Sequence, residues 1–141
     1  MKSLPHTDDT LLIRTDFSDQ AVWQSLRTAI MNPNEDDFLA NLHIVDDPSN
    51  RDLTTEEVVL LAPAGGFLLI VADKRSLTSA EMPLLAVLPK GADGDEPESG
   101  HRELRVTAAE LWSIENNISL ANMDWEDFVD AADDDGVFRG F

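Results

Sequence analysis

The chain has 141 residues, of which 28 are acidic and ten are lysine or arginine, so its formal net charge is −18. A negative field of this size repels phosphate backbones and anionic lipid, which argues against nucleic acid and membranes as partners and favours a basic protein. The absence of cysteine excludes disulfides, thiolate metal sites and cysteine nucleophiles. Because no apolar signal segment follows Lys2 and no apolar run is long enough to span a bilayer, we expect a cytoplasmic protein.

Strand and helix patterns alternate in the first part of the chain. Apolar runs and helical spacing predict four elements in order: a strand at Leu11–Ile13, a helix over Val22–Ile30, a strand at Leu42–Val45 and a helix over Thr55–Ala62. Ser18 or Asp19 can cap the first helix. Thr54 and Glu57 have the spacing of a capping box at the start of the second.

The second part of the chain adds five elements. They are a central strand at Phe67–Ala72, a strand at Leu84–Leu88, an edge-like strand at Arg102–Val106, a helix that carries Leu111 to Ile118 and a helix that carries Trp125 to Ala132. Capping-box spacing recurs at Thr78–Glu81 and Thr107–Glu110. Residues 90–100 are predicted to form an acidic surface loop and residues 1–9 a flexible N-terminus. Gly136 ends the last helix in a left-handed conformation and leaves a tail from Val137 to Phe141.

These elements predict a single α/β domain over residues 1–141. The fold is a sandwich with a mostly parallel sheet of about five strands and flanking helices, because parallel neighbours need helical crossovers. The strands at 84–88 and 102–106 are joined without a helix, so we expect an antiparallel pair, which allows one antiparallel strand at an edge.

Aspartates follow the first three predicted strands. They are Asp16 and Asp19 after the first, Asp46 and Asp47 after the second, and Asp73 after the third. Ligands of open α/β sheets bind beyond the carboxyl ends of the strands, so these side chains are candidates to hold Mg²⁺ or to act in acid–base chemistry. The competing interpretation is structural, since aspartate also caps helices and forms turns.

A second polar cluster lies in the predicted helices near the C-terminus. Glu115, Asn116 and Asn117 follow Trp112, and Asn122 comes shortly afterwards. Amides beside tryptophan are typical of a recognition surface or the rim of a pocket. The alternative is that the tryptophans belong to the core, which we favour for Trp125 and leave open for Trp112.

Signatures of catalysis are absent from the sequence. The chain contains no nucleophile elbow, no Walker A loop, no G-x-G-x-x-G motif and no H-E-x-x-H motif. His43 lies in an apolar strand, where a structural histidine is more common than a general base. The run Asp133–Gly136 does not fit a calcium-binding EF-hand, because the first ligand position would be Ala131.

Five segments resemble a known family. They are Leu11–Asp19 with Trp23, Ile44–Pro48, Ile70–Lys74, Glu110–Phe128 and Asp133–Phe141. Together they are similar to a family of small acidic single-domain proteins of actinomycetes and filamentous fungi that is described only as a domain of unknown function. The resemblance covers nearly the whole chain and implies no activity, cofactor or catalytic residue.

Two functional hypotheses remain from the sequence. The favoured one is an acidic protein-binding module, such as an immunity or antitoxin-type inhibitor of a basic partner, without catalysis and without a cofactor. The alternative is a small-ligand binder or metal-dependent enzyme that uses carboxylates at the carboxyl ends of the strands, with Mg²⁺ as the cation. The oligomeric state stays open.

Overall fold

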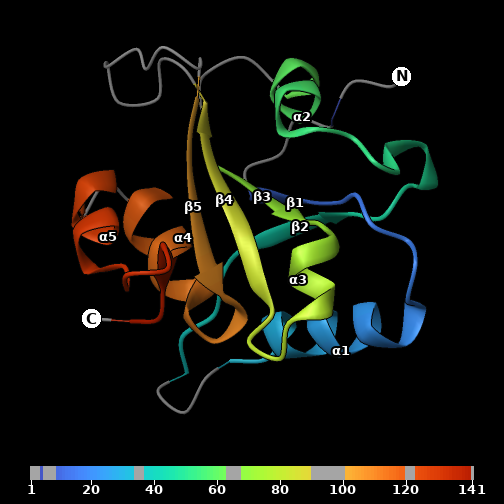
Figure 1. Ribbon diagram of the computed structural model, residues 1–141. Coiled ribbons are helices and arrows are strands. Elements are labelled where there is room, and N and C mark those ends of the chain that lie inside the picture. Colours follow the sequence, from blue (N-terminus) through green and yellow to red (C-terminus); the bar gives the residue numbers. More distant parts are fainter. Residues whose placement is uncertain are drawn as a thin grey trace.

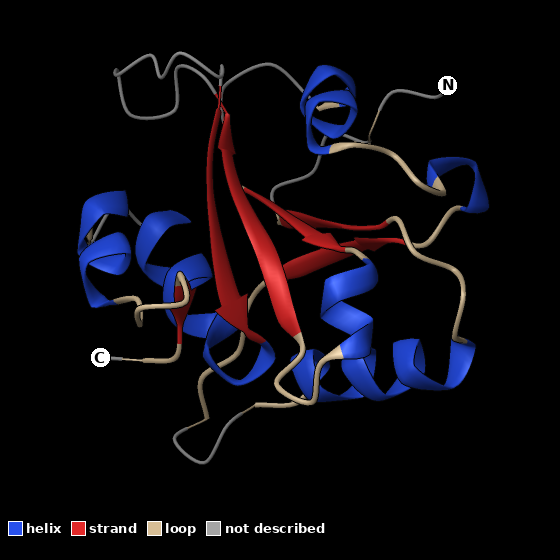
Figure 2. Cartoon of the chain, in the orientation of Figure 1, coloured by secondary structure: helices blue, strands red, loops and turns tan. Residues whose placement is uncertain are grey.

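The computed structural model describes Leu4 and residues 9–33, 37–62, 68–89, 101–119 and 123–140. Within these residues, six strands form one twisted sheet in the order β2-β1-β3-β4-β5-β6 (Figures 1 and 2). The strands are β1 (Thr10–Arg14), β2 (Leu42–Val45), β3 (Leu69–Ala72), β4 (Pro83–Pro89), β5 (His101–Thr107) and β6 (Val137–Phe138). The predicted loop at residues 90–100 lies outside the described residues.

The sheet is mostly parallel, as predicted. β1 pairs in parallel with β2 and β3, and β5 pairs in parallel with β6, whereas β4 is antiparallel to both of its neighbours. The predicted antiparallel pair of 84–88 with 102–106 is therefore confirmed, but its reversed strand, β4, lies inside the sheet. The connection from Ala72 to Pro83 is shorter than the dozen or so residues that a parallel crossover requires, so the chain returns antiparallel to β3.

Helices cover both faces of the sheet. Within the described residues these are α1 (Gln20–Met31), α2 (Thr55–Leu61), α3 (Lys74–Thr78), α4 (Leu111–Ser119) and α5 (Trp125–Ala131), with the 3₁₀ helices η1 (Pro48–Asn50) and η2 (Ala108–Glu110). Helices α1, α3, α4 and α5 contribute to one buried apolar cluster, and α2 contributes to the other. In Figure 1, α2 accordingly lies apart from the other four helices, across the sheet.

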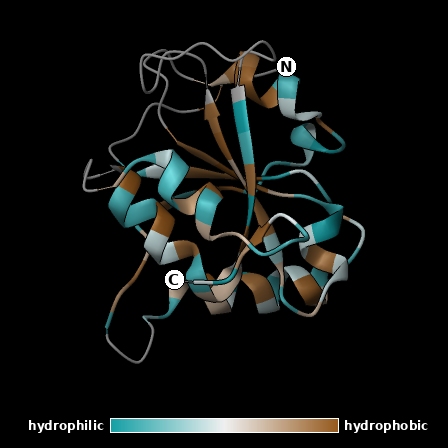
Figure 3. Cartoon of the chain, turned by 60° about the vertical axis from the view of Figure 1, so that its left-hand side comes forward, coloured by the Kyte–Doolittle hydropathy of each residue, from teal (hydrophilic) through white to brown (hydrophobic). Residues whose placement is uncertain are grey.

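Burial on both faces explains the unbroken apolar strands. Leu12 belongs to the cluster under α1, while its neighbours Leu11 and Ile13 belong to the cluster under α2. Figure 3 shows several strands that are largely hydrophobic, and helices that carry both hydrophilic and hydrophobic residues. The second cluster also includes Leu4, whose N–H donates to the carbonyl of Leu61 (2.9 Å). Residues 1–3 and 5–8 of the predicted flexible N-terminus lie outside the described residues.

Two of the predicted helix starts are confirmed in atomic detail. The Asp19 side chain accepts the N–H of Val22 (3.1 Å) at the start of α1. Thr54 and Glu57 form the predicted capping box, in which each side chain accepts the other residue's backbone N–H. These contacts satisfy donors that the first turn of a helix otherwise leaves free.

Two other predicted capping boxes are wrong. Thr78 and Glu81 flank the predicted turn before Pro83, but the Thr78 hydroxyl donates to the carbonyl of Lys74 and Glu81 pairs with Arg139. Thr78 is the last residue of α3, which Asp73 and Ser76 cap at its start. Thr107 precedes the 3₁₀ helix η2 and makes no capping hydrogen bond with its side chain. A threonine three residues before a glutamate is therefore an incomplete signal, because aspartate with serine satisfies the same donors.

The C-terminal segment adds a strand that the sequence pattern does not indicate. Gly136 has φ +79°, the predicted left-handed conformation, and it turns the chain back toward the sheet. Val137 and Phe138 then pair with Arg105 and Val106 as β6, where a tail is expected. β6 therefore covers part of the strand predicted at 102–106, which is not a free edge. The sequence pattern does not indicate β6 because two residues are too few to show an alternation of apolar and polar side chains.

Candidate functional site

The carboxyl ends of β1 and β3 form the point where the strand order reverses. From β1 the chain continues to β2 on one side, and from β3 it continues to β4 on the other. The chain thus leaves the two strands toward opposite edges of the sheet, and open α/β sheets bind ligands outside the carboxyl ends of their strands at such a point. Asp16 follows β1 and Asp73 follows β3, so two of the predicted site residues lie at this point.

A cavity of about 360 Å³ lies at this point. It is lined by Thr15, Asp16, Ser18, Asp52, Leu53, Asp73 and Lys74. An adjoining cavity of about 270 Å³ is lined by Asp16, Phe17, Ser18, Arg51 and Asp52. Because Asp16, Ser18 and Asp52 line both cavities, the two are parts of one polar depression, which we call the strand-end crevice.

Asp16 is the most buried acid of the strand-end crevice. Only 9% of the residue is exposed, and its Oδ1 accepts the N–H of Ser18 (2.9 Å). Its Oδ2 is buried and has no hydrogen-bond partner in the protein. A buried carboxylate oxygen without a donor is uncommon, because leaving it unpaired loses the hydrogen bonds that water supplies.

Arg14 holds the end of β2 against the end of β1. Its Nη1 donates to the carboxylate of Asp46 (3.1 Å), and its Nε donates to the backbone carbonyl of Asp16 (3.0 Å). The guanidinium carbon lies 4.3 Å from the ring centroid of Phe17 and 4.8 Å from that of Trp23. Asp46 is therefore half of a partly buried ion pair, which is a structural role.

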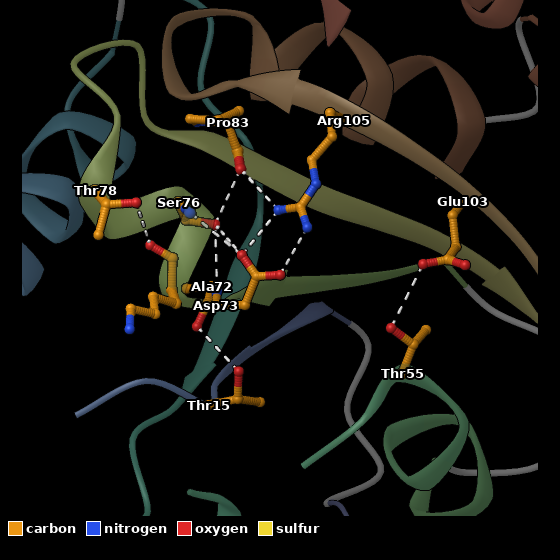
Figure 4. Close-up of polar contacts among 10 residues, drawn as sticks. Thr15, Thr55, Ala72, Asp73, Ser76, Thr78, Pro83, Glu103 and Arg105 are labelled. Carbon is orange, nitrogen blue, oxygen red and sulfur yellow. Dashed lines mark hydrogen bonds and ion pairs between the residues drawn. The ribbon is translucent and has the colours of Figure 1, made fainter. Parts of the chain in front are cut away.

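Asp73 has two structural roles at the end of β3. It caps α3 through Ser76, and its two carboxylate oxygens accept Nη1 and Nη2 of Arg105 from β5 (2.8 and 2.7 Å; Figure 4). Partial burial is the largest influence on the pKa of Asp73 and raises it, but the hydrogen bonds and charge of Arg105 and the bonds from Ser76 together outweigh burial. The pKa of Asp73 is therefore lowered below its ordinary value.

A lowered pKa predicts a defined pH dependence of stability. Above the unfolded-state pKa of about 3.9, the ionised Asp73–Arg105 pair stabilises the fold; this contribution disappears as the pH falls through the lower folded-state pKa. In urea titrations, we expect Asp73→Asn to lower the free energy of unfolding by about 1 kcal/mol at pH 7, a value discounted for partial exposure, with the difference from wild type shrinking below pH 4.

The choice of asparagine isolates the charge in this experiment, because asparagine also caps helices well. Arg105→Met should show the same pH dependence, and the double variant should lose little more than either single one. A difference between wild type and Asp73→Asn that is equal at pH 3 and pH 7 would contradict the ion-pair account.

The remaining strand-end aspartates are engaged in caps. Asp19 caps α1, and the carboxylate of Asp47 accepts the N–H of Ser49 (3.0 Å) at the start of η1. Among the residues that the structure describes, no group of three or more histidine, aspartate or glutamate side chains is placed to hold a metal ion. Of the five predicted strand-end aspartates, only Asp16 combines a cavity with an oxygen that the protein leaves unpaired.

The polar cluster on α4 holds a neighbouring loop. The carboxylate of Glu115, only 2% exposed, accepts the N–H of Asn41 (2.6 Å) and the hydroxyl of Thr10 (2.9 Å). Asn116 donates to the carbonyls of Leu39 (3.0 Å) and Trp112 (2.8 Å), and Asn117 donates to the carbonyl of Ser113. These side chains face the protein; Asn122 lies outside the described residues.

Trp112 lies between core and surface. The residue is partly buried and packs against the first apolar cluster, while its ring stacks on that of Phe38 at 4.6 Å and 10° between planes. Both rings line a cavity of about 180 Å³ between the end of α1 and η2. Trp125, by contrast, is buried, as predicted for a core residue.

Sequence reasoning missed the basic residues of the strand-end crevice. Lys74 and Arg51 line the crevice. Arg105 pairs with Asp73, and Arg14 donates to the backbone carbonyl of Asp16. The sequence pattern singles out none of these four residues. One signal was present in the sequence: Arg14 interrupts the apolar run that begins at Leu11. A charge inside a buried strand needs a partner of opposite sign, which the aspartates after the neighbouring strand supply.

Among the described residues, a dense acidic surface lies elsewhere, on α5 and the turn that follows it. Seven acids between residues 124 and 135 are all exposed: Asp124, Glu126, Asp127, Asp130, Asp133, Asp134 and Asp135. We call this set the α5 acidic surface. Arg102 pairs with Glu126 (2.6 Å), and Arg139 pairs with both Asp133 and Asp135 (2.7 Å each).

Comparison with known proteins identifies a family and no function. Residues 9–141 match the family model described as "Domain of unknown function (DUF6924)". The search of curated proteins found no match. Within the described part of the chain, no helix has the length and apolar character needed to cross a membrane.

Proposed function

The chain belongs to this family of unknown function, DUF6924, and we propose that it is an acidic binding module that docks a basic protein. An immunity or antitoxin-type inhibitor is the kind of protein that works in this way. The observation that carries the proposal is the α5 acidic surface, which gathers exposed carboxylates within one short helix and its following turn. The net charge of −18 gives the whole molecule a field of the same sign.

The packing of α5 explains why its acids face the solvent. Trp125 and Phe128 are buried, and the ring of Phe128 meets that of Phe138 on β6 edge to face at 5.1 Å. The apolar stripe thus fixes one side of the helix against the sheet edge and leaves the opposite side free. Figure 3 turns this side of the molecule forward.

Part of the α5 acidic surface lacks internal neutralisation. No described lysine or arginine forms an ion pair with Asp127, Asp130 or Asp134. Val129 lies among these acids and is 39% exposed. A basic partner would find carboxylates for its lysines and arginines around an apolar contact, the arrangement typical of a protein interface with a charged rim.

The state of the strand-end aspartates supports binding over catalysis. Asp19 and Asp47 cap helices, Asp46 pairs with Arg14, and Asp73 pairs with Arg105. Acid–base catalysis needs a titrating group within reach of a substrate, and these four carboxylates are held by internal partners. On the α5 acidic surface, by contrast, Asp130 and Asp134 have no ion pair with a described lysine or arginine.

The test compares two variants of equal charge. Asp130→Asn/Asp134→Asn and Asp37→Asn/Glu56→Gln each change the net charge from −18 to −16 at exposed positions, but only the first pair lies on the α5 acidic surface. Tagged wild-type protein is used at low ionic strength to isolate partners from host-cell lysate, and the binding of each purified partner is then measured against all three proteins. We expect a basic partner whose affinity falls about five- to tenfold, about 1 kcal/mol, for the α5 variant alone.

Three outcomes would overturn the proposal. One is that no protein binds even at low salt, another is that the retained proteins are not basic, and the third is that the two variants bind equally well. Increasing salt should weaken the wild-type complex chiefly through slower association, as electrostatic steering requires.

The proposal also covers location and relatives. It places the interaction in the cytoplasm, which the lack of cysteine supports because reducing compartments do not maintain disulfides. It further proposes a family of actinomycete and filamentous-fungal proteins that share the excess of negative charge.

A further inference from the structure

A cavity at η2 lies outside the strand-end crevice and is not used by docking through α5. It has a volume of about 520 Å³, more than either cavity of the crevice, and lies between α1, the turn before β4 and η2. We call it the η2 cavity. A concave site of this volume with an apolar wall and few polar groups is typical of small-molecule binding. Its apolar wall consists of Met82 and four alanines, Ala29, Ala80, Ala108 and Ala109.

The η2 cavity adjoins an aromatic one. The cavity of about 180 Å³ that Phe38 and Trp112 line shares three residues with it, Ala29, Ala108 and Ala109. The shared residues are all alanines, so no bulky side chain of the shared wall separates the two cavities. Flat apolar groups fit such a space, because aromatic rings make favourable contacts with one another and with alanine methyl groups.

Met82 has an uncommon backbone conformation on the wall of the η2 cavity. Its φ is +51°, in the left-handed region that residues other than glycine rarely adopt. Strained positions of this kind cluster at ligand sites, where the surrounding structure holds them. Here the N–H of Met82 donates to the carbonyl of Ser79 (3.0 Å). The thioether of methionine is flexible and polarisable and makes favourable contacts with aromatic rings, so this wall suits an aromatic ligand.

Glu110 is the carboxylate of the η2 cavity that no described residue pairs with. Glu81, the other acid of the lining, pairs with Arg139. Burial raises the pKa of Glu110, and no hydrogen bond or opposite charge from a described residue lowers it again. The carboxylate lies against Gly140, next to Arg139 of the lining, because a Cβ on Gly140 would come within 3.3 Å of its Oε1. Neither oxygen is buried, since the buried unpaired side-chain atoms in the described part of the chain all belong to other residues. A ligand can therefore reach the carboxylate.

Arg139, the one cation among the described lining residues, leaves no donor for an anion. Its Nε and Nη2 donate to Glu81 (2.6 and 3.0 Å). Its Nη1 donates to Asp133 and Asp135 (2.7 and 3.1 Å), and its Nη2 also donates to Asp135 (2.7 Å). These bonds occupy all five N–H groups of the guanidinium, whose single charge faces three carboxylates. An anionic ligand would meet the charge of Glu110 without a free cation to hold it, whereas an ammonium gains a charge-assisted hydrogen bond.

We propose that the η2 cavity binds a small aromatic amine, with the carboxylate of Glu110 as the acceptor for its ammonium group. The ring of the ligand lies against Met82 and the alanines of the wall. One free carboxylate suits an ammonium better than a metal ion, because among the described residues no three histidine, aspartate or glutamate side chains are placed to surround a metal. This function is independent of docking through the α5 acidic surface.

The experiment titrates ¹⁵N-labelled protein at pH 7 with three compounds that share a phenylethyl group and differ in charge: phenethylamine, 2-phenylethanol and 3-phenylpropionate. Backbone amides are followed by NMR. We expect phenethylamine to shift the amides of Met82, Ala109 and Glu110 in a saturable way, the alcohol to bind about tenfold more weakly, and the anion to shift none of them. Glu110→Gln should weaken phenethylamine binding about tenfold. Glu56→Gln is the matched control, since it removes the same charge from an exposed position on α2.

Each result decides the proposal. Saturable shifts that depend on Glu110 and not on Glu56 support it. It is overturned if phenethylamine produces no saturable shift, if the alcohol or the anion binds as tightly as the amine, or if the two variants weaken binding equally. Ala109→Leu tests the cavity with the carboxylate intact, because residue 109 is exposed on η2 and lines both cavities. We expect it to weaken phenethylamine binding, and unchanged binding would also overturn the proposal.

Discussion

Replacing Glu115 by alanine is expected to lower the free energy of unfolding by about 3 kcal/mol, because it removes two hydrogen bonds from a buried carboxylate. The N–H of Asn41 and the hydroxyl of Thr10 lose their acceptor together, and both lie at the start of neighbouring strands. Urea unfolding followed by far-UV circular dichroism gives the value. The exchange rate of the Asn41 amide should rise in the same variant, since its 2.6 Å hydrogen bond is gone.

Glu115→Gln is the control for this result. Its side-chain oxygen can still accept from Asn41, and its amide can donate to the Thr10 hydroxyl, which is both donor and acceptor. We therefore expect a loss of about 1 kcal/mol or less. If Glu115→Ala unfolds at the same urea concentration as wild type, Glu115 does not hold the loop, and its sequence-based assignment to a recognition surface would regain support.

The fold was predictable because its first elements carry complete local signals. Leu11–Ile13 and Leu42–Val45 are apolar runs with aspartates behind them, and both are strands. Thr54 and Glu57 carry the whole capping box within four residues. Each of these signals depends only on neighbours in sequence.

Elements that depend on distant partners could not be predicted. β6 exists because Val137 and Phe138 meet β5, and two residues carry no periodicity of their own. Helix α3 is missed for a different reason: its capping box is local, but the helix has only five residues, and Asp73 equally fits a ligand-binding aspartate at the end of a strand. The same residue type serves as cap, ion-pair partner and ligand, so residue type alone does not separate these roles.

The candidate site was predictable in position and not in chemistry. Strand order and the rule for carboxyl ends bring Asp16 and Asp73 to one cavity, which a sequence pattern can indicate. The difference between them comes from long-range contacts. Arg105 reaches Asp73 from β5, whereas no lysine or arginine in the described part of the chain forms an ion pair with the carboxylate of Asp16. Glu115 shows the same limit, because its partners Thr10 and Asn41 lie 105 and 74 residues away.

Trp23→Ala is expected to have the largest effect on stability, a loss of about 4 to 5 kcal/mol in the free energy of unfolding. The indole is fully buried, and its removal leaves a cavity between α1 and the sheet. The guanidinium of Arg14 also loses the ring it lies over at 4.8 Å, so a buried cation is left with less support. Since domains of this size have about 5 to 15 kcal/mol of stability, the variant should be close to unfolding at 37 °C.

Trp23→Phe separates the two contributions. Phenylalanine keeps an aromatic face under Arg14 and removes an indole N–H that has no partner in the protein, so the expected loss is about 1 to 2 kcal/mol. Urea titrations at pH 7 give the free energy of unfolding of both variants. The two values can be compared directly when the slope of that free energy against urea concentration is the same as in wild type. Equal losses for alanine and phenylalanine would show that neither the cavity nor the aromatic contact with Arg14 explains the role of Trp23.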